Sequence, residues 1–248
     1  MTLRALRPVL TMAALLAGLL LLLPLSTPVF HALFPGLERP LYTRASFLDL
    51  TMAHLQLVLG ATGAAALVGV SAGILVTRET GKRLLPLVSA TAAIGQTFPP
   101  VAVLALAVPI LGYGSGATLV ALFVYALLPI VANTVAGLQG VEASIRDAAD
   151  GMGFTPLRRL LQVELPLAAP VILAGIRTSA IINVGTATVG STVGALSLGS
   201  PIIEGLSGSN TAYVVQGAIL VATLALLIDR VFALASKARP VYAPPPVA

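Results

Sequence analysis

Long uninterrupted apolar runs constrain this sequence more than any other feature. Six of them lie at 9–30, 53–77, 85–111, 115–139, 167–190 and 212–235. A helix needs about 20 apolar residues to cross a hydrocarbon core about 30 Å thick, so each run is long enough. The runs do not alternate between apolar and polar residues, which argues against the strands of a membrane β-barrel. The sequence therefore predicts an all-α, polytopic membrane protein with about six transmembrane helices.

The composition excludes several other classes of protein. Only 9% of the 248 residues are charged, whereas a soluble domain carries about 25%. There is no cysteine, so disulfides and thiolate metal sites are excluded. His31 and His54 are isolated, and we expect no metal site. The net charge of +5 is spread over the loops and indicates membrane topology rather than binding to nucleic acid.

The run at 85–111 contains Phe98-Pro99-Pro100 near its middle. Proline has no backbone N–H and disfavours the helical conformation in the residue before it. We therefore expect a kink or a break at this point. A true break that adds a seventh segment remains an alternative.

The loop charges predict the orientation, because Lys and Arg accumulate on cytoplasmic loops. With the N-terminus inside, ten Lys and Arg residues fall on the predicted inner segments and only Arg39 and Arg44 on the outer ones. An additional crossing at Pro99-Pro100 would place the loop around Asp147 outside, against this asymmetry. Both termini are therefore predicted to be cytoplasmic.

Three regions are expected along the chain. Residues 1–51 form an N-terminal anchor helix and an extracytoplasmic loop, residues 52–236 the transmembrane domain, and residues 237–248 a proline-rich, disordered cytoplasmic tail. The first run could instead be a signal peptide, since Arg4 and Arg7 precede it. No small-x-small cleavage pattern follows, which favours an uncleaved anchor.

One sizeable polar loop separates the fourth and fifth runs. It reads Asp147-Ala148-Ala149, then three residues, Gly153, nine residues, and Val163-Glu164-Leu165-Pro166. The pattern predicts two short helices separated at a glycine, followed by a turn at Leu165-Pro166 into the fifth membrane helix.

Local chemistry supports this division of the loop. Gly151-Met152-Gly153 is expected to end the first short helix, because glycine readily adopts the left-handed conformation at a helix C-terminus. Thr155 is a good N-cap and Pro156 suits the first position of the second helix. An ordinary amphipathic loop at the membrane interface would have the same local features.

The spacing within the loop resembles the EAA loop of bacterial ABC-importer permeases, with Asp147 for the usual Glu and Val163 for the usual Ile. In that family the loop docks on a separate ATPase subunit. The resemblance implies that the ATPase-coupling residues are Asp147, Ala148, Ala149, Gly153, Val163, Leu165 and Pro166. The small side chains of Ala148 and Ala149 would allow close approach of the partner.

The resemblance extends to the permeases of osmoprotectant importers. It is carried by four segments, Gly95–Pro100, Tyr125–Thr134, Leu165–Thr178 and Ile182–Thr188. It implies the five-helix core of type I importer permeases, a fold like that of the methionine permease, with one additional N-terminal helix. The function implied is import of glycine betaine, choline or a related quaternary ammonium by alternating access. An importer of another small solute, such as an amino acid, remains an alternative.

The same resemblance implies the partners: two ATPase subunits, a second permease copy or a homologous permease, an extracytoplasmic substrate-binding protein and the lipid of the cell inner membrane. ATP and Mg would be bound by the ATPase, because the only Gly-Lys pair, Gly81-Lys82, lacks the rest of a Walker A motif. We therefore expect no cofactor in this chain and a non-catalytic subunit.

Several polar and aromatic side chains lie within the apolar runs. They are either interhelical hydrogen-bonding groups or the lining of a translocation path. The candidates for the path are Gln96, Thr97, Phe98, Asn133, Asn183, Thr186 and Thr188.

Arg177 lies well inside the fifth run. We interpret it as a structural arginine bonded to neighbouring carbonyls or subunits, with a role in the path as the alternative. A stand-alone secondary transporter or channel is disfavoured, because ion coupling needs intramembrane carboxylates and the runs hold none before Asp229.

Overall fold

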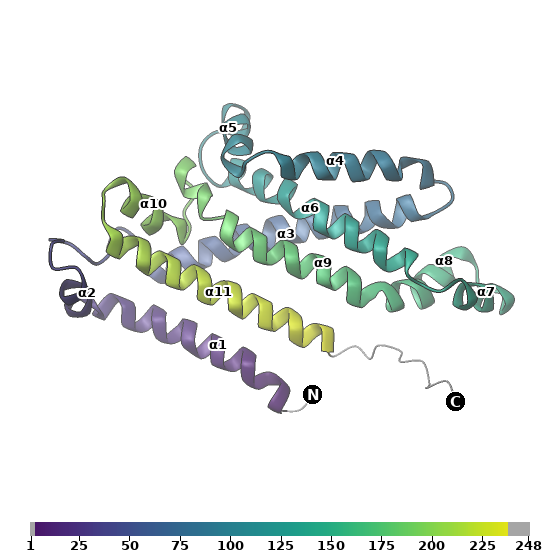
Figure 1. Ribbon diagram of the computed structural model, residues 1–248, viewed down its shortest axis with the longest axis horizontal. Coiled ribbons are helices and arrows are strands. Elements are labelled where there is room, and N and C mark those ends of the chain that lie inside the picture. The colour runs from purple at the N-terminus through teal and green to yellow at the C-terminus, as the bar shows by residue number, and fades with distance from the viewer. Residues whose placement is uncertain (1–2, 238–248) are drawn as a thin grey trace.

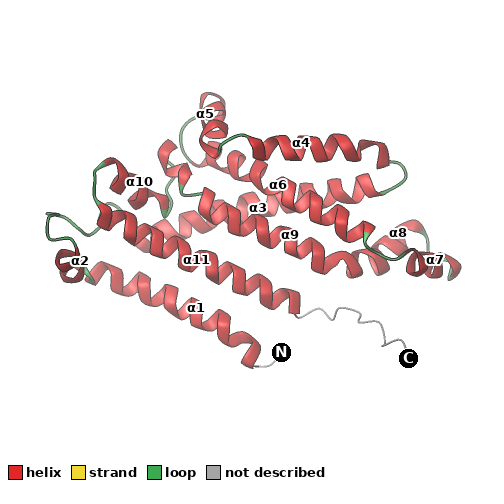
Figure 2. Cartoon of the chain, viewed as in Figure 1, coloured by secondary structure: helices red, strands yellow, loops and turns green. Residues whose placement is uncertain are grey.

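The computed structural model describes residues 3–237, and this part of the chain is helical, with no strand (Figures 1 and 2). The long helices are α1 (Leu3–Leu22), α3 (Phe47–Thr77), α6 (Ser115–Gln139), α9 (Leu165–Thr186) and α11 (Thr211–Lys237). The shorter ones are α2 (Thr27–Leu33), α4 (Leu85–Thr97), α5 (Pro100–Leu111), α7 (Ala143–Gly151), α8 (Pro156–Arg159) and α10 (Gly199–Ser207). The predicted all-α fold is confirmed.

Five helical stretches in the described residues are long and apolar enough to cross a membrane, and α4 with α5 supplies a sixth when counted as one bent span. The bend between α4 and α5 is 97°. The 13 residues of α4 reach only about 20 Å at 1.5 Å per residue, too little to cross alone. The break expected at Phe98-Pro99-Pro100 is therefore confirmed.

The centre of the bundle is built from α3, α6 and α9, which pack on one another. Glycines allow these helices to approach closely. A Cβ atom on Gly175 of α9 would lie 2.6 Å from Cβ of Asn133 in α6, and one on Gly73 of α3 would lie 2.6 Å from Cγ2 of Thr134. Close van der Waals packing is a main source of helix association in lipid, so these positions fix the core.

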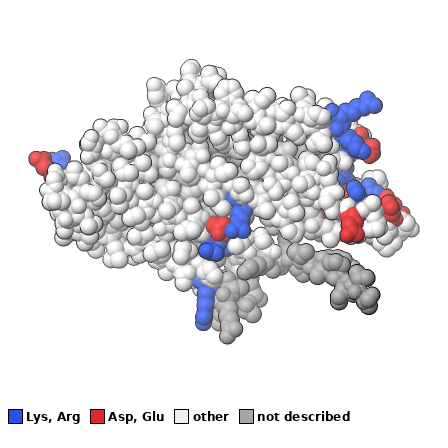
Figure 3. Space-filling view, in the orientation of Figure 1, with Lys and Arg blue, Asp and Glu red and all other residues white. Residues whose placement is uncertain are grey.

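The remaining helices surround this centre. In Figure 1, α1 runs antiparallel to α11, on which it packs, while α10 lies at the left-hand end and α7 and α8 project at the right-hand end. Figure 3 shows charged side chains gathered mainly at the right-hand end, with a smaller charged group near the middle of an otherwise largely uncharged surface. We call the right-hand end the basic end, after Arg78, Lys82, Arg83, Arg146, Arg158 and Arg159.

Three details differ from the expectations. The apolar run at 9–30 is divided, since α1 ends at Leu22 and a 3-10 turn with Pro24 leads to α2. Helix α3 begins at Phe47 rather than at residue 53. Of the expected tail, Lys237 is the last residue of α11, and positions 238–248 lie outside the described residues.

The predicted turn at Leu165-Pro166 is wrong. Helix α8 continues into α9 through a π-helical turn at Leu160–Glu164, giving one helical stretch from Pro156 to Thr186. Pro166 removes one backbone donor at the beginning of α9, and a wider π-helical turn directly before it lets the chain continue without a sharp corner.

Replacing Gly175 with Ala should destabilise the bundle by about 1–3 kcal/mol, because the new methyl group overlaps Asn133 and overpacks the α6–α9 contact. The matched control is Gly63→Ala, whose added Cβ would meet nothing within 4 Å. Thermal unfolding of both purified variants in detergent measures the difference. Equal unfolding temperatures would contradict the assigned packing of α6 and α9.

Candidate functional site

In the polar loop at the basic end, α7 is the first short helix that was predicted, whereas α8 is the beginning of the longer stretch that continues into α9. Helix α7 ends at Gly151, and Gly153 has φ +79°, a left-handed conformation that favours glycine. The hydroxyl of Thr155 accepts a hydrogen bond from the backbone N–H of Arg158 at 3.3 Å, and Pro156 follows it at the first position of α8. The local predictions for Gly153, Thr155 and Pro156 are confirmed.

A shallow apolar groove lies between α7 and the start of α9. Its volume is about 380 Å³, and it is lined by Ser144, Ile145, Ala148, Ala149, Met152, Val163 and Leu167. Three residues of the motif, Ala148, Ala149 and Val163, therefore come together on one surface. Asp147 and Ala148 are exposed, whereas Ala149 is only 1% exposed because its own chain covers it.

The other motif residues do not line this groove. Gly153 lies in the connection between α7 and α8. Leu165 packs against a buried apolar cluster formed by Leu138, Ala168 and Ile172, and Pro166 is in the first turn of α9. The motif thus spans both the exposed loop and its attachment to the bundle.

A group of four charged residues joins this loop to the rest of the bundle. The side chain of Glu164 is 2% exposed and lies 2.6 Å from Nη2 of Arg78, at the end of α3. Its other oxygen accepts a hydrogen bond from Nε of Arg159 at 2.9 Å. Arg159 also forms an ion pair with Asp150 of α7. We call Arg78, Asp150, Arg159 and Glu164 the ionic cluster.

Sequence reasoning did not identify the ionic cluster. It treated the arginines only as markers of topology and Glu164 as the variable position of the motif. One signal was present, since a carboxylate at the edge of an apolar run becomes costly when buried and therefore needs a cationic partner. The sequence could not show which arginine supplies it.

The candidate path residues do not share one surface. Gln96 donates to the carbonyl of Tyr125 at 2.8 Å, and Asn183, which is fully buried, donates to the hydroxyl of Thr62 at 3.0 Å. Both are interhelical bonds. Thr97 and Phe98 are exposed beside the α4–α5 break.

The remaining candidates bond to a carbonyl three or four residues earlier or are half-buried. Asn133 donates to the carbonyl of Pro129 at 2.8 Å, and Thr188 to that of Gly185 at 2.7 Å. Thr186 is half-buried near the end of α9. The path assignment of all seven residues stays a prediction.

Arg177 has a partner inside the bundle. Its Nε donates to Oδ1 of Asp229 at 2.8 Å, which joins α9 to α11. The structural interpretation of Arg177 agrees with this contact, although the partner is a carboxylate rather than the expected carbonyl or subunit. The pair therefore gives each of these two charges a partner of opposite sign across α9 and α11.

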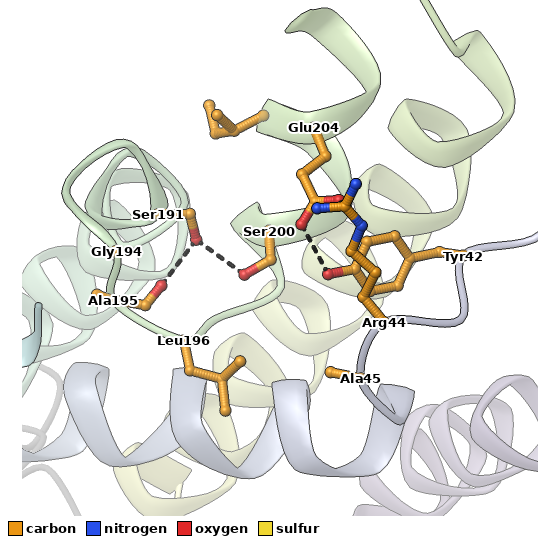
Figure 4. A pocket seen from close by; sticks show the side chains of 10 residues that line it. Tyr42, Arg44, Ala45, Ser191, Gly194, Ala195, Leu196, Ser200 and Glu204 are labelled. Carbon is orange, nitrogen blue, oxygen red and sulfur yellow. Dashed lines mark hydrogen bonds and ion pairs between the residues drawn. The ribbon is translucent and has the colours of Figure 1, made fainter. Parts of the chain in front are cut away.

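A second, more polar pocket lies at the end opposite the basic end (Figure 4). It has a volume of about 260 Å³ and lies between the segment before α3, the segment after α9, and α10. The hydroxyl of Tyr42 donates to Oε1 of Glu204 at 3.1 Å, and Nε of Arg44 lies 3.1 Å from Oε2. Burial and this hydrogen bond to Glu204 raise the pKa of Tyr42 to about 12, so its hydroxyl stays a donor at neutral pH.

Hydrogen bonds also attach residues 39–42 to α11 and to Asn210, the residue directly before it. Nε2 of Gln216, which is fully buried, donates to the carbonyl of Pro40 at 2.6 Å, and its Oε1 accepts from the backbone N–H of Tyr42 at 3.1 Å. The side chain of Asn210 donates to the carbonyl of Arg39 at 2.9 Å. Sequence reasoning assigned no role to Gln216 or Asn210.

Comparison with known proteins places these features in a family. Residues 67–239 match the binding-protein-dependent transport system inner membrane component family. The osmoprotectant import permease protein OsmY of Salmonella typhimurium is 44% identical over 198 residues, which are 80% of this chain and 84% of that protein. The choline transport system permease protein OpuBB of Bacillus subtilis is 41% identical over 187 residues, or 75% of this chain and 85% of that protein.

The fold also resembles a solved structure. An inward-facing conformation of the MetNI methionine ABC transporter contains a chain that superposes with a TM-score of 0.69 at 24% identity. The match covers 76% of this chain and 94% of the other. This likeness establishes the expected type I importer permease fold.

Proposed function

This chain belongs to the binding-protein-dependent transport system inner membrane components, and from its similarity to osmoprotectant and choline permeases we propose that it imports a compatible solute such as glycine betaine or choline. It is a multi-pass permease subunit of an ABC importer in the inner membrane. The observation that carries the solute assignment is its identity of 44% and 41% to permeases named for osmoprotectants and for choline.

We propose that the basic end faces the cytoplasm. Arginine and lysine gather there, and cytoplasmic loops carry an excess of both. In this orientation α7, α8 and the ionic cluster lie in the cytoplasm or at its interface. The pocket beside Tyr42 and Glu204 then lies on the extracytoplasmic side, where a substrate-binding protein would deliver the solute.

Coupling to ATP hydrolysis is proposed to occur through α7. Asp147 and Ala148 are exposed on this helix, and the apolar groove beside them offers a surface for partner side chains. Docking of a short helix into a groove of a partner is a common recognition mode. Two ATPase subunits, which bind ATP and Mg, would each engage one α7 of a permease pair. Their closure would drive alternating access.

The proposed orientation predicts the labelling of single cysteines introduced into this cysteine-free chain. Thr80→Cys lies in the exposed connection at the basic end, and Ser207→Cys at the exposed opposite end. A membrane-impermeant thiol reagent added to intact cells should label only position 207, and position 80 should react after permeabilisation. Labelling of position 80 in intact cells would reverse the orientation.

The solute assignment predicts ATP-dependent uptake of glycine betaine or choline by the permease reconstituted with its ATPase and binding protein. Uptake of radiolabelled solute into proteoliposomes is the measurement, with liposomes lacking ATP as the control. Uptake of methionine without any response to betaines or choline would overturn the solute assignment and leave the permease assignment intact.

The coupling assignment predicts that Gly153→Val and Ala148→Glu both weaken ATPase binding and transport. The valine strains a left-handed position by about 1–2 kcal/mol, and the glutamate adds a charge at the proposed contact. Gly151→Val is the matched control, because Gly151 is helical with open space around it. Co-purification and uptake are measured together. Normal uptake in both variants, with the ATPase bound, would exclude α7 as the coupling element.

A further inference from the structure

The ionic cluster links two parts of the molecule that otherwise pack on different neighbours. Helix α3 packs on α6 and α9, whereas α7 packs on α8 and the π-helical turn. Asp150 of α7 binds Arg159, Arg159 binds Glu164, and Glu164 binds Arg78 at the end of α3. The four side chains therefore form a continuous connection from the exposed loop to the bundle centre.

We propose that Glu164, held between Arg78 and Arg159, is a positioning residue that makes the α7–α8 loop and the end of α3 move as one body. Movement of the ATPase then reaches α3 directly as well as α9. This inference rests on the proposed function, because it takes α7 to be the element that the ATPase moves.

Because Glu164 is buried, its ion pairs with Arg78 and Arg159 are costly to separate. The Glu164 side chain is 2% exposed, and those of Arg78 and Arg159 are 26% and 22% exposed. Separating one partner of a buried ion pair leaves an uncompensated charge, which is strongly unfavourable. By contrast, the neighbouring pair of Lys82 and Glu79 is 67% and 90% exposed, and such surface pairs contribute little. The loop is therefore held at Glu164 rather than by the surrounding charges.

The position of Glu164 also explains how a movement of the α7–α8 loop reaches both α3 and α9. Glu164 lies in the π-helical turn, directly before Leu165 at the beginning of α9. Its partner Arg78 directly follows Thr77, the last residue of α3. Helix α3 in turn contacts α9 through the hydrogen bond between Thr62 and Asn183, deep in the bundle. A displacement of the loop thus acts on the end of α3 and on the beginning of α9. The two helices are also joined within the bundle by the hydrogen bond between Thr62 and Asn183.

The first test compares Glu164→Gln with Glu79→Gln in the reconstituted importer. Glutamine keeps the shape of Glu164 and removes the charge that attracts both arginines. We expect the ATPase to remain bound to Glu164→Gln, while solute transported per ATP hydrolysed falls by about tenfold. Glu79→Gln should keep the wild-type ratio. A wild-type ratio in Glu164→Gln would overturn the proposal.

A cross-link supplies a rescue that a purely structural role does not predict. Because the chain has no cysteine, Arg78→Cys and Glu164→Cys can be combined and joined by a short bifunctional thiol reagent. We expect poor coupling before cross-linking and recovery of transport per ATP afterwards. A cross-linked protein that binds the ATPase but does not transport would overturn the proposal, because the two positions must then separate during the cycle.

The remaining outcomes distinguish this inference from the proposed function. If Gly153→Val and Ala148→Glu leave ATPase binding and uptake normal, the coupling assignment of α7 fails. If α7 is confirmed as the docking element but Glu164→Gln releases the ATPase, Glu164 supports docking and the transmission role is wrong. A cluster needed only for folding would reduce the amount of protein in the membrane and leave transport per ATP unchanged in the protein that folds, which also overturns the proposal.

Discussion

The whole structure depends on one constraint: inside hydrocarbon, every polar group must find its partner within the protein. Helices satisfy the backbone, and several polar side chains in the bundle find partners on neighbouring helices. Ser179 donates to the carbonyl of Ala126 at 2.8 Å across α9 and α6, and Arg177 pairs with Asp229 across α9 and α11. These contacts, together with the close approach at Gly73 and Gly175, leave the central helices few alternative arrangements.

Features with local causes could be predicted from the sequence. The apolar runs predicted the spans, and Pro99-Pro100 predicted the bend, because a missing donor acts on the residues beside it. Gly153 and Thr155 defined the ends of the two loop helices through their own backbone and side-chain preferences. The spacing around Asp147 also predicted the family, and residues 67–239 match that family.

Features that depend on tertiary packing could not be predicted. Glu164 and Arg78 are far apart in the sequence, so no local pattern pairs them. Ala149 was expected to contact the partner, but it is buried against its own chain, and no local pattern in the sequence shows that. Pro166 suggested a corner because the sequence does not show that a π-helical turn can accommodate it. The hydrogen bond between Asn183 and Thr62 joins residues 121 positions apart, so no local pattern indicated it.

The attachment of residues 39–42 bears on how independent the N-terminal part is. The family match begins at residue 67, so α1, α2 and this segment resemble an addition to a self-sufficient core. Gln216 nevertheless belongs to α11, within the matched region, and both ends of its buried amide are bonded to the added segment. A shortened chain would leave that amide without partners, at a cost of about 1–3 kcal/mol for each orphaned group. The stability of the matched region therefore depends on the N-terminal part, even though the family match does not include it.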